Sequence, residues 1–185
     1  MYIIVGLGNP EEEYSNTRHN MGFDTINKIA EQYKIKISKT NFKGKYGNGI
    51  IENEKVILLK PQTYMNLSGE SIKEIIQFYK IETNKLIIIY DDIDIDTGII
   101  KIRKTGGPGT HNGMKSVIKE IGTQDFIRIR IGIGKPEHKE DLINYVIGGI
   151  PKEEREKLDK GTDLAKDAVI EVIKNGVDIA MNKFN

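Results

Sequence analysis

Short, wholly apolar runs alternate along the chain with longer segments whose apolar residues recur every three or four positions. The runs YIIV at 2–5 and KLIIIY at 85–90 are typical of strands buried on both faces of a sheet. Residues 47–60 predict a hairpin, while 98–103 and 126–134 alternate like strands with one polar face. The polar side chains on the last of these strands are arginines, which predicts a basic face.

Apolar residues with helical spacing predict four helices between and after these strands. The predicted helices cover residues 21–33, a segment ending near Tyr79, a segment from GGPGTHNG through Ile121, and a long segment from Pro151 to Asn175. Asn66 or Ser68 is expected to cap the second of them. The order of elements predicts an α/β fold over residues 1–185: a single three-layer domain with a mixed β-sheet flanked by helices on both faces.

Length and composition narrow the classes of protein that this chain can represent. A chain of 185 residues fits one domain, and 38% hydrophobic with 30% charged residues is typical of an ordinary globular protein. The lack of cysteine excludes disulfides, a thiolate nucleophile and thiolate metal sites. No secretory signal pattern or apolar run of membrane-spanning length is visible, so we expect a cytoplasmic protein with no membrane partner.

The net charge of +1 conceals two basic windows. No acid lies between Glu31 and Glu52, where there are five lysines, and none lies between Asp96 and Glu120, where there are five further basic residues. The rest of the chain is therefore acidic. A basic face of this kind suits a phosphate backbone, because binding to phosphates depends on local charge. A solvated lysine-rich surface is the alternative.

Polar side chains follow several of the predicted strands, where ligands of open α/β sheets bind. Asn9 and His19 follow the first strand, Asn66 follows the hairpin, Asp91 closes KLIIIY, and Asn112 lies where the glycine-rich loop enters a helix. We expect a single cleft that holds a histidine, a carboxylate and three amides.

These residue types can activate water. A neutral His19 can take a proton from water if a carboxylate such as Asp91 orients its ring, and amides can donate to a developing oxyanion. Taken alone, these residues are more typical of simpler roles: His19 of a surface or cap histidine, the aspartates of a polar turn, and Asn66 and Asn112 of helix caps. The histidines lack the close spacing of a zinc motif, so no metal site is predicted.

Five blocks of the sequence, spread over its whole length, resemble bacterial-type peptidyl-tRNA hydrolases. The blocks are GLGNPEEEYSNTRHNMGFD, LLKPQTYMNLSGES, IIIYDDIDIDTG, GGPGTHNGMKSVI and RIRIGIGKP. The resemblance implies a monomer with a twisted mixed sheet that hydrolyses the ester between peptide and tRNA, without metal or cofactor. It further implies that free tRNA is recycled for translation.

The resemblance also implies roles for individual residues. It makes His19 the general base, Asp91 its orienting partner, and Asn9 a residue that helps to distinguish N-blocked from free aminoacyl-tRNA. The other residues implied to bind the substrate at the cleft are Tyr14, Tyr64, Met65, Asn66 and Asn112. Three further residues would hold the acceptor stem of tRNA: Lys101, Arg103 and Arg130.

Three positions depart from the family pattern. Glu11 and Thr110 each replace a common glycine, and Asp96 replaces a frequent proline. Glu11 adds negative charge near a site for a polyanion. Two other functions remain possible: a non-catalytic RNA-binding module of the same fold, and a nucleotide-binding oxidoreductase suggested by GLGNP after a strand, although Glu11 stands where that motif needs its third glycine.

Overall fold

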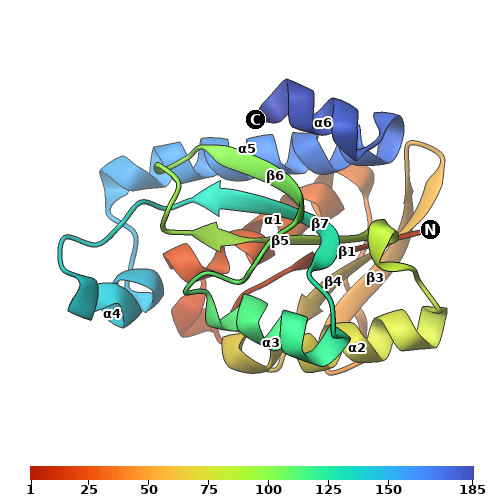
Figure 1. Ribbon diagram of the computed structural model, residues 1–185, viewed down its shortest axis with the longest axis horizontal. Helices are drawn as coiled ribbons and strands as arrows, with labels where there is room; N and C mark the ends of the chain where they lie inside the picture. Colours follow the sequence, from red (N-terminus) through yellow and green to blue (C-terminus); the bar gives the residue numbers. More distant parts are fainter.

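The two wholly apolar runs form the centre of a seven-stranded sheet. In the computed structural model, which describes residues 1–185, β1 (Tyr2–Gly6) lies between β4 (Glu54–Pro61) and β5 (Leu86–Asp92) and is parallel to both. Every residue of β1 is buried, because helices cover both faces of the sheet at this point (Figure 1).

Antiparallel strands complete the sheet on both sides. β3 (Gly44–Ile51) pairs with β4 as the predicted hairpin, and the short β2 (Lys39–Asn41) forms one edge. On the other side β7 (Asp125–Gly132) is parallel to β5, and β6 (Ile100–Thr105) is the antiparallel edge strand. The sheet is therefore mixed, as predicted.

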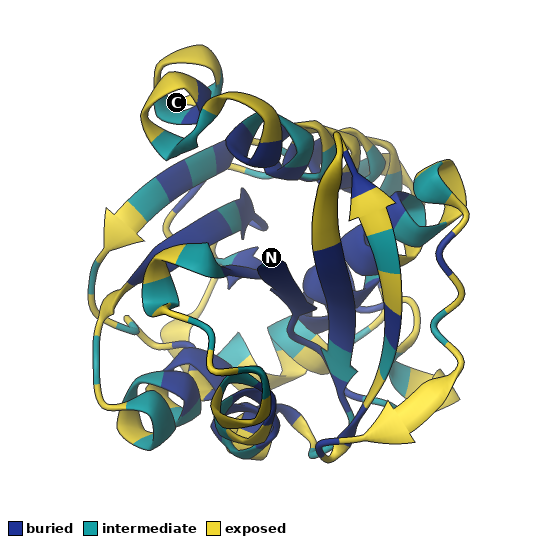
Figure 2. Cartoon of the chain, turned by 90° about the vertical axis from the view of Figure 1, so that its right-hand side faces the viewer, coloured by how far each residue is buried: buried dark blue, intermediate teal, exposed yellow.

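Two helical layers enclose the sheet, each with its own apolar core (Figures 1 and 2). One layer contains α1 (Met21–Tyr33), α5 (Lys152–Asn175) and α6 (Val177–Phe184), and the other contains α2 (Ser68–Tyr79) and α3 (Asn112–Ile121). The short α4 (Leu142–Ile147) lies beyond the carboxyl end of β7. Single 3₁₀ turns cover Glu12–Tyr14, Arg18–Asn20, Met65–Leu67, Thr83–Lys85 and Lys139–Asp141. The three-layer α/β architecture is confirmed.

The sequence did not predict β2, α4 or α6, and the predicted cap of α2 is wrong. Leu67 occupies the cap position of α2 and makes no capping bond. The Ser68 hydroxyl donates to the Met65 carbonyl at 2.7 Å, and the Gly69 N–H donates to Ser116 Oγ at 2.9 Å. A polar group of α3 thus satisfies one N–H of the first turn of α2, and the preceding 3₁₀ turn accepts the Ser68 N–H through the Met65 carbonyl, so neither Asn66 nor Ser68 caps the helix.

The first turn of α1 approaches the sheet so closely that only glycine fits. A Cβ added at Gly22 would lie 2.4 Å from the Leu7 nitrogen and 2.5 Å from the Ile89 oxygen. These are backbone atoms of the loop after β1 and of β5, so they cannot move aside as a side chain could. Because α1 begins at Met21, two residues after His19, this contact also helps to determine where the histidine lies.

We expect Gly22→Ala to lower the free energy of unfolding by about 1–3 kcal/mol, because the methyl group must displace backbone in a packed core. Thermal unfolding followed by circular dichroism measures the effect. Gly149→Ala is the control, since a Cβ there meets no atom within 4 Å. Equal melting temperatures for the two variants would contradict the proposed contact.

Candidate active site

Two histidines hold the Asp91 carboxylate at the end of β5. His19 Nδ1 lies 2.8 Å from Asp91 Oδ2, and His111 Nε2 lies 3.0 Å from Oδ1. Asp91 is 2% exposed, and both imidazoles are buried. His19 comes from the 3₁₀ turn before α1 and His111 from the loop before α3, so three separate segments meet at one side chain.

The hydrogen bonds determine the tautomer of each imidazole. The N–H of Met114 donates to His111 Nδ1 at 3.2 Å, which makes His111 the side-chain cap of α3. His111 Nε2 must then carry the hydrogen that it donates to Asp91. Since the carboxylate also requires a donor from His19 Nδ1, the neutral His19 ring has its lone pair on Nε2.

The same contacts keep Asp91 charged despite its burial. Burial raises the pKa of Asp91, but the charges and hydrogen bonds of the two imidazoles lower it by more, so the net pKa lies far below its ordinary value. Burial of the ring lowers the pKa of His19, whereas the charge of Asp91 and its hydrogen bond together raise it by more, so the net pKa is raised. Asp91 therefore makes His19 a stronger base than a buried imidazole without an acid partner.

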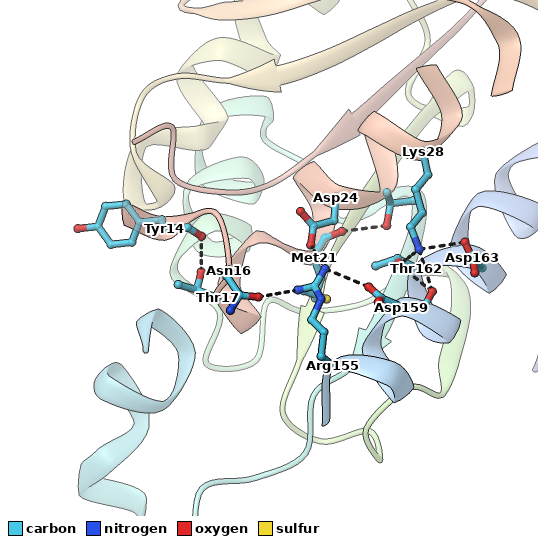
Figure 3. Close-up of polar contacts among 11 residues, drawn as sticks. Tyr14, Asn16, Thr17, Met21, Asp24, Lys28, Arg155, Asp159, Thr162 and Asp163 are labelled. Carbon is cyan, nitrogen blue, oxygen red and sulfur yellow. Dashed lines mark hydrogen bonds and ion pairs between the residues drawn. The ribbon is translucent and has the colours of Figure 1, made fainter. Parts of the chain in front are cut away.

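Helix α5 and Tyr145 of α4 hold the loop that carries His19. The Arg18 guanidinium bonds to Glu154 at 2.7 Å and to the Tyr145 carbonyl at 2.9 Å, and it lies over the Tyr145 ring. Arg155 reaches Asn16 and, through an ion pair, Asp24 of α1, as Figure 3 shows. The loop is thereby fixed at several points immediately beside the histidine.

Asn9 is held by its backbone and by its side-chain oxygen. The Asn20 side chain accepts from the Asn9 N–H at 2.8 Å and donates to the Asn9 carbonyl at 3.0 Å. Asn9 Oδ1 accepts from the Met65 N–H at 2.8 Å. The Nδ2 group of Asn9 makes no bond within the protein, so it can donate to a ligand.

A cavity of about 130 Å³ opens beside the three central residues. His19, Asp91 and Asn112 line it together with Arg130, and residues of α4 form another wall. Asn112 also lines a neighbouring surface hollow, together with Asn66 and the lysines of α3. The structure thus brings three of the five predicted cleft residues into one cavity, and it places Asn66 just outside. As the first residue of α3, Asn112 is not its cap.

The remaining predicted cleft residues lie around the loop after β1. Met65 is buried and contacts Asn9 through its backbone, whereas Tyr14 points away from the residues that hold the loop (Figure 3). Neither Tyr14 nor Tyr64 lines the cavity. The Tyr64 hydroxyl donates to the Glu11 carboxylate, and this hydrogen bond lowers the pKa of Glu11. Glu11 therefore has a structural partner, which the sequence did not suggest.

Basic residues cover the face of β6 and β7 beside the cavity. Lys101 lies opposite Arg130 in the antiparallel ladder, and Arg103 lies opposite Arg128. Side chains of directly opposed residues share one face of the sheet. Arg130 pairs with Asp92 at 3.0 Å. Neither Lys101 nor Arg103 forms an ion pair.

Arg128 corrects the predicted basic face, because it is 1% exposed. Its guanidinium donates to the carbonyl of Gly106 at 2.8 Å and to that of Gln124, and it lies over the Phe126 ring. These carbonyls flank the loop and helix that carry His111 and Asn112. Arg128 thus braces part of the site from beneath and is unavailable to solvent.

His19, Asp91 and His111 are also the residues that could hold a metal ion, since their ligand atoms lie within 4.8 Å of one another. Two imidazoles and a carboxylate are a common ligand set. However, a metal at His111 Nε2 would require the neutral ring to carry its hydrogen on Nδ1, where the Met114 N–H already donates. The hydrogen bonds of this group therefore do not suit a resident metal. The sequence spacing of the histidines gave no sign that they meet.

Comparison with known proteins assigns this site to a family. The family model described as peptidyl-tRNA hydrolase matches residues 3–185. The chain belongs to the peptidyl-tRNA hydrolase family. Peptidyl-tRNA hydrolases from Clostridium novyi (strain NT) and Clostridium perfringens (strain SM101 / Type A) are 53% and 50% identical to it over the whole chain, which spans 98% and 97% of their lengths. The crystal structure of peptidyl-tRNA hydrolase from Acinetobacter baumannii is 40% identical, with a TM-score of 0.95 over 100% of this chain and 94% of that one.

Membership of the peptidyl-tRNA hydrolase family confirms the resemblance of the five sequence blocks. The hypothesis of a nucleotide-binding oxidoreductase is therefore dropped. The family's activity is the cleavage of peptidyl-tRNA. No helix of the protein is both long and apolar enough to span a membrane.

We expect Asp91→Asn to lower the pKa of His19 below its ordinary value of 6.5, because burial then acts without a neighbouring carboxylate. Titration of the imidazole resonances by NMR measures the shift. The exposed His138 is the internal control, since its resonance should be the same in both proteins. A His19 pKa that stays raised in the variant would show that Asp91 is not the cause.

Proposed function

We propose that this protein hydrolyses the ester bond of peptidyl-tRNA with His19 as general base. The observation that carries the proposal is the His19–Asp91–His111 arrangement at the cavity, in which one imidazole nitrogen remains free and basic. Family membership supports the substrate. The non-catalytic RNA-binding module is the alternative that the experiments must exclude.

In the proposed mechanism, His19 Nε2 takes a proton from a water molecule in the cavity, and the oxygen attacks the ester carbonyl carbon. The tetrahedral intermediate then collapses, and the bond between this carbon and the ribose oxygen breaks. The leaving ribose oxygen takes the proton back from His19, so the products are a peptide with a free carboxyl group and a free tRNA. Asp91 stabilises the imidazolium that forms between these steps.

Amides around the cavity are proposed to bind the substrate and the oxyanion. The Met65 N–H fixes the Asn9 amide by donating to its Oδ1, so Nδ2 is the donor left for a carbonyl of the peptide or of an N-blocking group. The first backbone N–H groups of α3 have no partner within the helix, and they begin at Asn112 beside the cavity. Such donors favour developing negative charge. Tyr14, Tyr64, Met65 and Asn66 would form the outer walls.

The basic face is proposed to hold the acceptor stem of tRNA. Lys101 and Arg103 are free of ion pairs, and the ladder joins them to Arg130 at the cavity. A phosphate backbone on this face would direct the ester toward His19. Because the resident groups alone can perform the chemistry, we propose an enzyme that requires no metal or cofactor. The family resemblance supports a cytoplasmic monomer.

We expect His19→Ala to lower kcat by at least about 10²-fold while tRNA still binds, because only the base is removed. The assay measures release of N-acetylaminoacyl groups from tRNA, in the presence of a chelator. His138→Ala is the matched control, since that histidine is exposed and lies outside the cavity.

Three results would contradict this proposal. Near-normal turnover by His19→Ala would exclude the general base, and inhibition of the unchanged protein by the chelator would exclude a metal-free mechanism. No cleavage by the unchanged protein would favour the RNA-binding module. Unblocked aminoacyl-tRNA serves as the control substrate and should be cleaved far more slowly.

We expect Arg103→Ala and Arg130→Ala to weaken tRNA binding and to reduce the dependence of log Kd on log salt by up to about 0.9 for each lost phosphate contact. Binding is measured between about 50 and 200 mM salt. Lys160→Ala on α5 is the control, since this exposed lysine pairs with Glu156 away from the cavity. A slope equal to that of the unchanged protein would remove the mutated residue from the phosphate contact.

A further inference from the structure

The strand that carries Lys101 and Arg103 lies at an edge of the sheet. β6 pairs with β7 on one side only, so every second residue turns its backbone N–H and C=O away from the sheet. Such free groups must be satisfied by water or by another part of the chain. Ile102 is the residue whose outward backbone groups lie between the two basic residues.

The side chain of Asn185 satisfies both of these groups. The Ile102 N–H donates to Asn185 Oδ1 at 2.7 Å, and Asn185 Nδ2 donates to the Ile102 carbonyl at 3.0 Å. The amide thus takes the place of a residue in a neighbouring strand. Asn185 follows α6, which packs beside β6 (Figure 1), and an ion pair at 2.8 Å between Lys104 and Asp178 joins the same two elements.

The bonds of Asn185 also reach the basic side chains. The Ile102 carbonyl accepts a second hydrogen bond, at 2.9 Å, from Nη1 of Arg103. Asn185 and the Arg103 guanidinium therefore share one acceptor atom. Since side chains alternate along a strand, Ile102 is buried in the core while Lys101 and Arg103 point to the opposite face.

We propose that Asn185 is a positioning residue for RNA binding. By holding the backbone of Ile102, it keeps Lys101 and Arg103 beside Arg130 on the face that would contact the acceptor stem. The inference rests on the proposed function, because it deepens the role given there to the basic face. Without the amide, the edge of β6 exchanges these two bonds for water, and the backbone between the two cations is held only by its pairing with β7. Binding of RNA must then order the strand, which costs affinity but does not affect the chemistry at His19.

The test compares Asn185→Ala with Asn182→Ala, which removes an exposed asparagine of α6 with no hydrogen bond to β6. We expect KM and the Kd for tRNA to rise about three- to tenfold in Asn185→Ala, with kcat unchanged and a smaller salt dependence of binding. Asn182→Ala should match the unchanged protein. Asn185→Asp should bind RNA more weakly than Asn185→Ala, since its carboxylate lies beside the Arg103 guanidinium and competes with phosphate.

A merely structural role for Asn185 would lower the melting temperature and leave KM, Kd and the salt dependence unchanged, and this result would overturn the inference. Arg103→Ala in the same assay separates the inference from the proposed function. If Arg103→Ala weakens binding and Asn185→Ala does not, only the inference is wrong. If neither variant weakens binding, the RNA contact proposed for β6 is wrong, and the inference is overturned with it.

Discussion

The burial of one carboxylate sets the geometry of this protein's site. Asp91 is almost fully buried and remains charged, so each of its carboxylate oxygens requires a hydrogen-bond donor. His19 and His111 supply these donors from segments on opposite faces of the sheet. The loop before α1, the end of β5 and the start of α3 must therefore meet at one point, and a shift of any one would leave a buried charge unsatisfied.

The surrounding structure meets this requirement by fixing loops with polar side chains. Arg18 bonds to Glu154 of α5 and to Tyr145 of α4, and Arg155 of α5 bonds to Asn16. Arg128 holds the carbonyls on both sides of the α3 segment, and Asn20 holds the backbone of Asn9. Long polar side chains suit this purpose, because a loop offers few apolar groups to pack. The buried polar groups near the site are thus mostly supports, and few are free to contact a ligand.

Two parts of the surface near the site differ in charge. The face of β6 and β7 is basic and reaches the cavity through Arg130, whereas the loop after β1 carries Glu11 to Glu13. In the proposed function, this arrangement would attract a phosphate backbone to the basic side only. The net charge of +1 conceals this division, since the 28 basic and 27 acidic residues of the whole chain nearly cancel. The acidic loop is stabilised locally by the bond between Glu11 and Tyr64 rather than by a basic partner.

Local pattern determined most of the fold. The apolar runs became β1 and β5, and the helical spacing correctly predicted α1, α2, α3 and α5, because burial on one or two faces leaves a period in the sequence. β2 and α6 were not predicted because they are short, and the three residues of β2 are all exposed, so that strand leaves no apolar period. His19, Asp91 and the three amides were predicted from their positions after strands, and the family resemblance supplied Tyr14, Tyr64, Met65 and the role of the basic residues. Only the tertiary structure decided that His111 shares Asp91, that Arg128 is buried, and that Asn185 completes β6, because each of these contacts joins residues far apart in the chain and leaves no local pattern.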